Sequence, residues 1–72
     1  MSLEEKIALL EETLEMDKGT LSPDMNLDDV EEYDSVTKLS IIVMMDDEFG
    51  VKVNSDIIRS FVKVQDILDL MQ

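Results

Sequence analysis

Residues 34–50 read DSVTKLSIIVMMDDEFG, a stretch in which a polar start and an apolar middle lead to an acidic end and a glycine. Asp34 and Ser35 are both good N-cap residues, because their side-chain oxygens can accept the unpaired amide hydrogens of a helix's first turn. Gly50 is a typical helix stop, since glycine readily adopts the left-handed conformation that closes many helices. The stretch therefore predicts a helix from Ser35 to about Phe49.

The apolar residues of this predicted helix form two neighbouring arcs when they are laid out at about 100° per residue. The arc that is wide enough for a core face contains Ile41, Ile42, Met45 and Phe49. The second arc, which we call the outer arc, contains Val36, Leu39 and Val43, with Ser40 and Asp47 at its borders. An amphipathic helix needs only one core face. The outer arc is therefore either covered by the preceding loop or free as a docking surface.

The last turn of the same predicted helix is acidic: it contains Asp46, Asp47 and Glu48. Carboxylates there oppose the helix dipole and cost about 0.3–1 kcal/mol each at low salt. The cluster is either a recognition feature or a solvated acidic face, and the sequence favours neither reading.

The segment before residue 34 predicts one helix and a long loop. Apolar residues recur at helical spacing in Leu3, Ile7, Leu10 and Leu14. Ser2 is placed to cap this helix, and we expect Gly19 to end it. The loop from Thr20 to Tyr33 carries apolar residues that a free linker would lack, so we expect it to be pinned to the core. These residues are Leu21, Met25, Leu27 and Val30.

The segment after Gly50 predicts a connector and two short helices. The alternation Val51-Lys52-Val53 has no second strand to pair with and is interpreted as a connector. Ser55 is expected to cap a brief helix that carries Ile57, Ile58 and Phe61. A last helix from about Val64 to Met71 places Val64, Ile67, Leu68 and Met71 on one face. The predicted fold is all-α: a small four-helix bundle with a long first loop and a short third helix, forming one domain over residues 1–72.

Composition excludes several classes of function. The chain of 72 residues has no cysteine and no histidine, so it can form neither a nucleophile–histidine pair nor an ordinary zinc site. Its formal net charge of −12 disfavours nucleic acid and anionic membrane surfaces and favours basic protein partners. We find no secretory signal and no apolar stretch of membrane-spanning length, and we expect a cytoplasmic monomer.

One calcium-binding pattern fails on inspection. Asp24, Asn26 and Asp28 match the first ligand positions of an EF-hand loop. The positions that require a glycine and a bidentate glutamate hold Asp29 and Ser35 instead. We therefore expect no dedicated metal site.

Ser35 stands where a polar acidic loop meets an apolar helix, which is how a serine would be presented to another enzyme. A phosphate ester on Ser35 would lie at the positive end of the helix dipole, among free backbone N–H groups. Because the chain lacks most means of doing chemistry itself, we expect no catalytic residue. The prediction is that Ser35 is modified by an enzyme and does not attack a substrate.

Taken together, these segments resemble the acyl carrier proteins of fatty acid and polyketide synthesis over almost the whole chain. The resemblance rests on Asp34-Ser35-Val36, on Asp47-Glu48-Phe49-Gly50 and on the closing Val64-Gln65-Asp66-Ile67-Leu68. It implies that Ser35 carries 4′-phosphopantetheine, added from coenzyme A by a phosphopantetheinyl transferase, and that the distal thiol of this arm holds acyl groups as thioesters. It also implies that Asp34 helps to recruit the transferase and its Mg²⁺. Beside these positions, the core face would open to shelter an acyl chain.

The resemblance further implies a docking surface on the second helix for acyl-loading and acyl-transferring enzymes with basic patches. Its residues are Val36, Leu39, Ser40, Val43 and Asp47. Four positions depart from the family pattern: Tyr33 and Val36 around the serine, Ser40 where an acidic residue is common, and Asn54 where a proline is frequent. Fatty acid, polyketide and specialised pathways therefore all remain open. The alternative from another class is an unmodified acidic helical adaptor that binds a basic protein partner.

Overall fold

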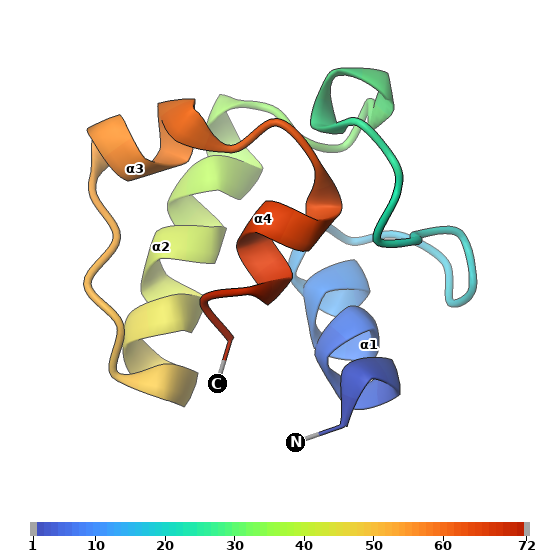
Figure 1. The fold of residues 1–72 in the computed structure, drawn as a ribbon, viewed down its shortest axis with the longest axis horizontal. Coiled ribbons are helices and arrows are strands. Elements are labelled where there is room, and N and C mark those ends of the chain that lie inside the picture. The colour runs from blue at the N-terminus through green and yellow to red at the C-terminus, as the bar shows by residue number, and fades with distance from the viewer. Residues whose placement is uncertain (1, 72) are drawn as a thin grey trace.

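The computed structural model describes residues 2–71, which form four α-helices and no strand (Figure 1). In chain order the elements are α1 (Leu3–Thr13), the 3-10 turn η1 (Leu27–Asp29), α2 (Ser35–Phe49), α3 (Ser55–Ser60) and α4 (Val64–Leu68). The predicted all-α class is confirmed, as are the long first loop and the short third helix. No helix within these residues is both long and apolar enough to cross a membrane.

The start of α1 is as predicted, but its end is not. The Ser2 hydroxyl accepts the Glu5 N–H at 3.2 Å, and the Glu5 carboxylate accepts the Ser2 N–H in return. The expectation that Gly19 ends the helix is wrong, because α1 ends at Thr13. Glu15 adopts a positive φ of 59° directly afterwards and turns the chain away from the helix axis. A left-handed non-glycine residue leaves no clear signal in the sequence.

The loop between α1 and α2 is pinned to the core, as predicted. Leu21, Leu27 and Val30 are buried, and Met25 packs against them. Three backbone hydrogen bonds fix the loop to the chain around the start of α4. The Leu27 N–H donates to the Val62 carbonyl at 2.9 Å, the Val64 N–H to the Met25 carbonyl at 3.0 Å, and the Gln65 N–H to the Pro23 carbonyl at 3.0 Å. The apolar side chains of the loop therefore pack into the core.

A buried carboxylate holds the beginning of this loop, and sequence reasoning missed it. Glu11 is 3 % exposed, and its Oε2 accepts the N–H groups of Gly19 at 2.9 Å and Leu21 at 3.0 Å. These two amides have no helix or sheet partner, so the carboxylate satisfies backbone donors that would otherwise be costly to bury. In the sequence, Glu11 is one of many acidic residues and nothing distinguishes it.

The boundaries of α2 are as predicted. Gly50 follows its last residue with a φ of 66°, and the Val51 N–H donates to the Met45 carbonyl at 3.1 Å, closing the helix. Ile41 and Met45 are completely buried, which confirms the core face. Met44 is also buried and widens this face beyond the predicted arc.

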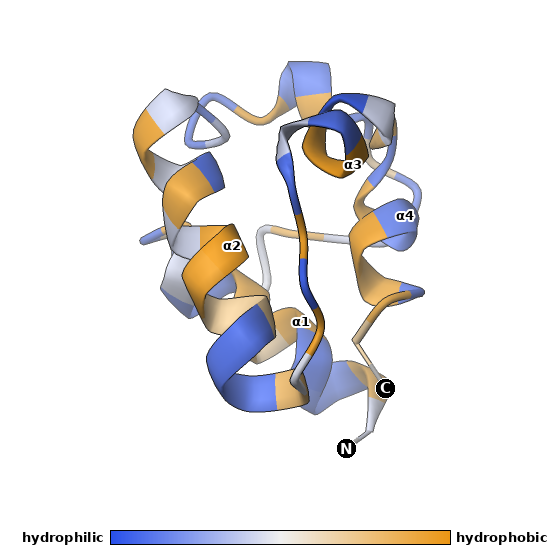
Figure 2. Ribbon diagram, turned by 90° about the vertical axis from the view of Figure 1, so that its left-hand side faces the viewer, coloured by the Kyte–Doolittle hydropathy of each residue, from blue (hydrophilic) through white to orange (hydrophobic). Residues whose placement is uncertain are grey.

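Two details of the C-terminal half differ from prediction. Asn54, not Ser55, caps α3: its side-chain oxygen accepts the Ile57 N–H at 2.9 Å. The last helix ends at Leu68 and not at Met71. The chain after it forms turns up to Met71, whose side chain is fully buried. The connector runs back alongside α2, so α3 lies at the end of the molecule where α2 begins (Figures 1 and 2).

Candidate functional site

Ser35 is the first residue of α2, and its side chain is exposed. Its hydroxyl makes no hydrogen bond within residues 2–71, because the preceding residue provides the cap. Asp34 Oδ1 accepts the N–H groups of Val36 at 3.0 Å and Thr37 at 2.9 Å. Of the two candidate caps, Asp34 therefore holds the helix and leaves the Ser35 hydroxyl free.

The hydrogen bonds at Asp34 also set its charge. The bond from the Thr37 N–H, helped by the Thr37 hydroxyl and the Val36 N–H, holds the pKa of the Asp34 carboxyl below its ordinary value. The side chain thus stays ionised at neutral pH. Its second oxygen makes no hydrogen bond within the described residues and remains available.

Thr37 fixes the turn before the helix, a role that sequence reasoning missed. Its hydroxyl accepts the Asp34 N–H at 2.9 Å and donates to the Glu32 carbonyl at 2.5 Å. With the reverse bond from the Thr37 N–H to Asp34, this forms a capping box. The detectable signal is an Asp with a hydroxyl residue three positions later.

The expectation that a phosphate on Ser35 would find free backbone N–H groups is corrected by this geometry. The Val36 and Thr37 amides are occupied by Asp34, and the Lys38 amide donates to the Asp34 carbonyl at 2.9 Å. A phosphate on Ser35 would lie at the positive end of the α2 dipole, but it could not accept hydrogen bonds from these three amides.

A hollow of about 250 Å³ opens between α2 and α3, directly beside the serine; we call it the α2–α3 hollow. Its lining residues are Ser35, Lys38, Leu39, Ile42, Ser55, Ile58 and Arg59. Leu39, Ile42 and Ile58 give it apolar walls. Lys38 is held over the ring of Tyr33, with its Nζ 5.1 Å from the ring centroid.

Tyr33, one of the departures from the family pattern, is half-buried under Lys38. Its hydroxyl is buried and has no hydrogen-bond partner among the described residues. Burial raises the pKa of the Tyr33 phenol above its ordinary value. The bulky side chain therefore packs against the core and holds a cation in the lining that includes Ser35.

The outer arc of α2 is exposed and not covered by the loop. Val36, Leu39 and Val43 have exposed fractions of 71 %, 65 % and 59 %. Together with Ser40 and Asp47 they border a shallow hollow of about 670 Å³ between α2 and α1. Figure 2 shows the hydrophobic middle of α2 and its hydrophilic acidic end on the side of the molecule that faces the viewer.

The structure brings all five predicted docking residues together on one surface and adds residues from α1. Leu9, Glu12 and Thr13 line the same hollow, as does Glu48 of α2. Sequence reasoning missed the contribution of α1, because the packing angle between α1 and α2 decides which flank of α1 lies beside the outer arc.

Metal-ligating groups are not gathered anywhere in residues 2–71: no three His, Cys, Asp or Glu side chains are placed to hold an ion. Asp24 and Asp28, the carboxylates with EF-hand spacing, are likewise not part of such a group.

Comparison with known proteins identifies the family. A family model described as the phosphopantetheine attachment site matches residues 7–71. The chain belongs to the acyl carrier protein family. It is 30 % identical over 63 residues to acyl carrier proteins of Myxococcus xanthus and Micrococcus luteus, an overlap that covers 88 % of this chain and 80 % and 78 % of theirs. No solved structure matches it significantly.

Members of this family carry a covalently attached 4′-phosphopantetheine and interact with phosphopantetheinyl transferases and acyl-handling enzymes. The residues around Ser35 fit this group. The chain presents an exposed serine hydroxyl that makes no hydrogen bond within residues 2–71, and beside it lies a hollow with apolar walls.

Proposed function

We propose that Ser35 is the attachment site and that the chain carries acyl groups between biosynthetic enzymes as thioesters on its prosthetic arm. The observation that carries this proposal is that Asp34 caps α2 while the Ser35 hydroxyl takes no part in the cap. Asp34 makes the capping hydrogen bonds, so the Ser35 hydroxyl can form a new bond without destabilising the helix.

The chemistry of attachment needs little from this chain. The Ser35 oxygen bonds to the phosphorus of coenzyme A that bears the pantetheine, adenosine 3′,5′-bisphosphate leaves, and the hydroxyl proton passes to the transferase. Asp34, held ionised by its hydrogen bonds, offers its second oxygen to the Mg²⁺ that the transferase binds. Once attached, the arm supplies a thiol for thioester formation, and the chain itself supplies no catalytic group.

Partner enzymes bind the outer arc together with the carboxylates beside it. The apolar side chains of Val36, Leu39 and Val43 fill a small contact, and Asp47, Glu48 and Glu12 meet Lys and Arg of the partner. Charge then mainly governs the rate of encounter, and the apolar contact governs release. We assign the chain as a single monomeric carrier domain of the cytoplasm, serving fatty acid, polyketide or specialised biosynthesis.

The test is incubation with coenzyme A, Mg²⁺ and a broad-specificity phosphopantetheinyl transferase, followed by mass spectrometry of the intact protein. We expect the mass of one phosphopantetheine to be added, and Ser35→Ala to abolish the gain. Ser55→Ala is the matched control, because Ser55 is also an exposed first residue of a helix. A gain that persists in Ser35→Ala would place the attachment on another residue. No gain with several transferases would favour the unmodified acidic adaptor.

A further inference from the structure

The α2–α3 hollow differs in charge from the rest of this acidic surface. Three other hollows on the described residues are each lined by at least two carboxylates, for example Asp66 and Asp69 in one of them. The α2–α3 hollow is lined by no carboxylate and by two of the six cations of the chain, Lys38 and Arg59. In a chain with a net charge of −12, the candidate serine thus borders a hollow whose charged lining residues are both cations.

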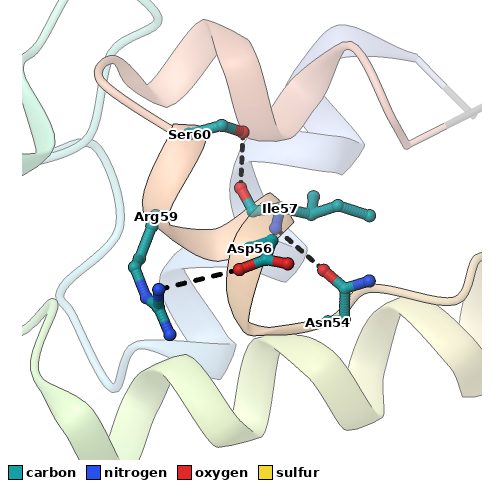
Figure 3. A network of polar contacts seen from close by, with 5 residues as sticks. All are labelled: Asn54, Asp56, Ile57, Arg59 and Ser60. Carbon is teal, nitrogen blue, oxygen red and sulfur yellow. Dashed lines mark hydrogen bonds and ion pairs between the residues drawn. The ribbon is translucent and has the colours of Figure 1, made fainter.

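Both cations are available to a ligand. Arg59 lies 3.6 Å from Asp56 on the same helix (Figure 3), but the two side chains are 76 % and 89 % exposed. Such a pair binds weakly and yields readily to a better partner. Lys38 is placed by the Tyr33 ring, a contact that orients its ammonium group without neutralising it. Lys38 also lies three positions after Ser35, the spacing at which side chains of a helix are neighbours.

An anion attached to Ser35 needs this compensation. The ionised Asp34 precedes it and repels a second negative charge, and Asp34 already occupies the amides of Val36 and Thr37. The charged donors among the lining residues are the ammonium group of Lys38 on α2 and the guanidinium group of Arg59 on α3. Guanidinium groups suit the oxygens of phosphate esters particularly well.

We infer that Lys38 and Arg59 bind the phosphodiester of the prosthetic group on Ser35 and thereby hold the base of the arm in the α2–α3 hollow, against Leu39, Ile42 and Ile58. This inference rests on the proposed attachment at Ser35. Its consequence is that modification links α3 to α2, because one cation comes from each helix.

The experiment compares the apo and modified forms by NMR. In the wild-type protein, modification should shift the backbone amides of residues 55–59 and the Arg59 side-chain N–H, and these shifts should shrink as salt screens the contact. The double variant Lys38→Gln/Arg59→Gln should lose the shifts at α3. Lys52→Gln is the control matched to Arg59→Gln: each removes one positive charge, but Lys52 pairs with Asp46 near the opposite end of α2. Arg59→Gln alone provides a variant at an exposed position in case the double variant does not fold.

Mass spectrometry keeps the inference separate from the function on which it depends. If the wild-type protein gains no prosthetic group, attachment at Ser35 is wrong. If all variants are modified and the shifts at α3 persist in both Lys38→Gln/Arg59→Gln and Arg59→Gln, or are absent from the wild-type protein, the inference is wrong. Loading the thiol with octanoyl or succinyl groups distinguishes the two sources of an anion. Shifts that appear only with succinyl would mean that the cations bind a carboxylate of the cargo and not the phosphodiester.

Discussion

The starts of α2 and α3 have nearly the same local geometry and sharply different surroundings. Ser35 and Ser55 are each an exposed first helical residue, each follows a side chain that caps the helix, and both line the α2–α3 hollow. Beside Ser35, however, lies a helix of 15 residues with an exposed apolar arc, whereas α3 has 6 residues and continues with charged Asp56 and Arg59. The local geometry therefore does not distinguish the two serines, and we expect the adjoining surface to decide which of them is modified.

The most severe test of this comparison places an aspartate before Ser55 of α3, as Asp34 stands before Ser35 of α2. Ser35→Ala combined with Asn54→Asp gives α3 the same acid-then-serine start. We expect no mass gain from the transferase, because Leu39 is the one outer-arc residue that lines the hollow beside Ser55. Intact-protein mass spectrometry gives an all-or-none answer. Modification of Ser55 in this variant would mean that the local motif is sufficient and the surface is not needed.

The second test removes the surface and keeps the motif. Val43→Asp places a charge in the apolar contact, which we expect to weaken transferase binding tenfold to a hundredfold, roughly 1.4–2.8 kcal/mol, mainly through faster dissociation. Val62→Asp is the matched control, because Val62 is similarly exposed at 61 % but lies in the segment between α3 and α4. Binding can be followed by surface plasmon resonance. If circular dichroism shows that Val43→Asp is unfolded, the outer arc belongs to the core and is not a docking surface.

A smaller difference is expected in the stability of the two helix starts. Thr37→Val removes the hydroxyl that both accepts from Asp34 and donates to Glu32, and it should cost about 1–2 kcal/mol. α3 has Ile57 at the equivalent position and relies on one bond from Asn54, so Asn54→Ala should cost about 1 kcal/mol. Urea denaturation measures both. A larger loss for Asn54→Ala would show that α3 is the more tightly fixed of the two starts.

The smallest effect is a difference in pH dependence. The folded-state pKa of Asp34 lies below its unfolded value of about 3.9, so its contribution to stability is present above that value and is lost as pH falls through the folded pKa. Asn54 does not titrate. Asp34→Asn should therefore lose less stability than the wild type between about pH 4 and pH 2. Parallel curves in this range would mean that other carboxyls with lowered pKa, such as Glu5 and Asp66, account for all of the acid sensitivity.

The sequence by itself determined the features that depend on near neighbours in the chain. The bounds of α2 follow from a capping side chain before Ser35 and a left-handed glycine after Phe49, both of which act within one turn. The separation of core face from outer arc follows from helical spacing alone, and Ile41, Met45 and the three outer valine and leucine side chains lie as that spacing predicts. Ser35 was singled out by its place at the predicted helix start and by the resemblance carried by Asp34-Ser35-Val36.

Only the tertiary structure decided what depends on segments distant in the chain. The outer arc is free because the loop directs Leu21, Leu27 and Val30 into the core instead of across α2, and α3 reaches Ser35 because the connector runs back along α2. The buried carboxylate of Glu11 was invisible beforehand, since its partners are eight and ten residues away in a loop without regular structure. Helix periodicity and caps are local properties of a few residues, whereas the choice of which surfaces meet is made by burial summed over the whole chain.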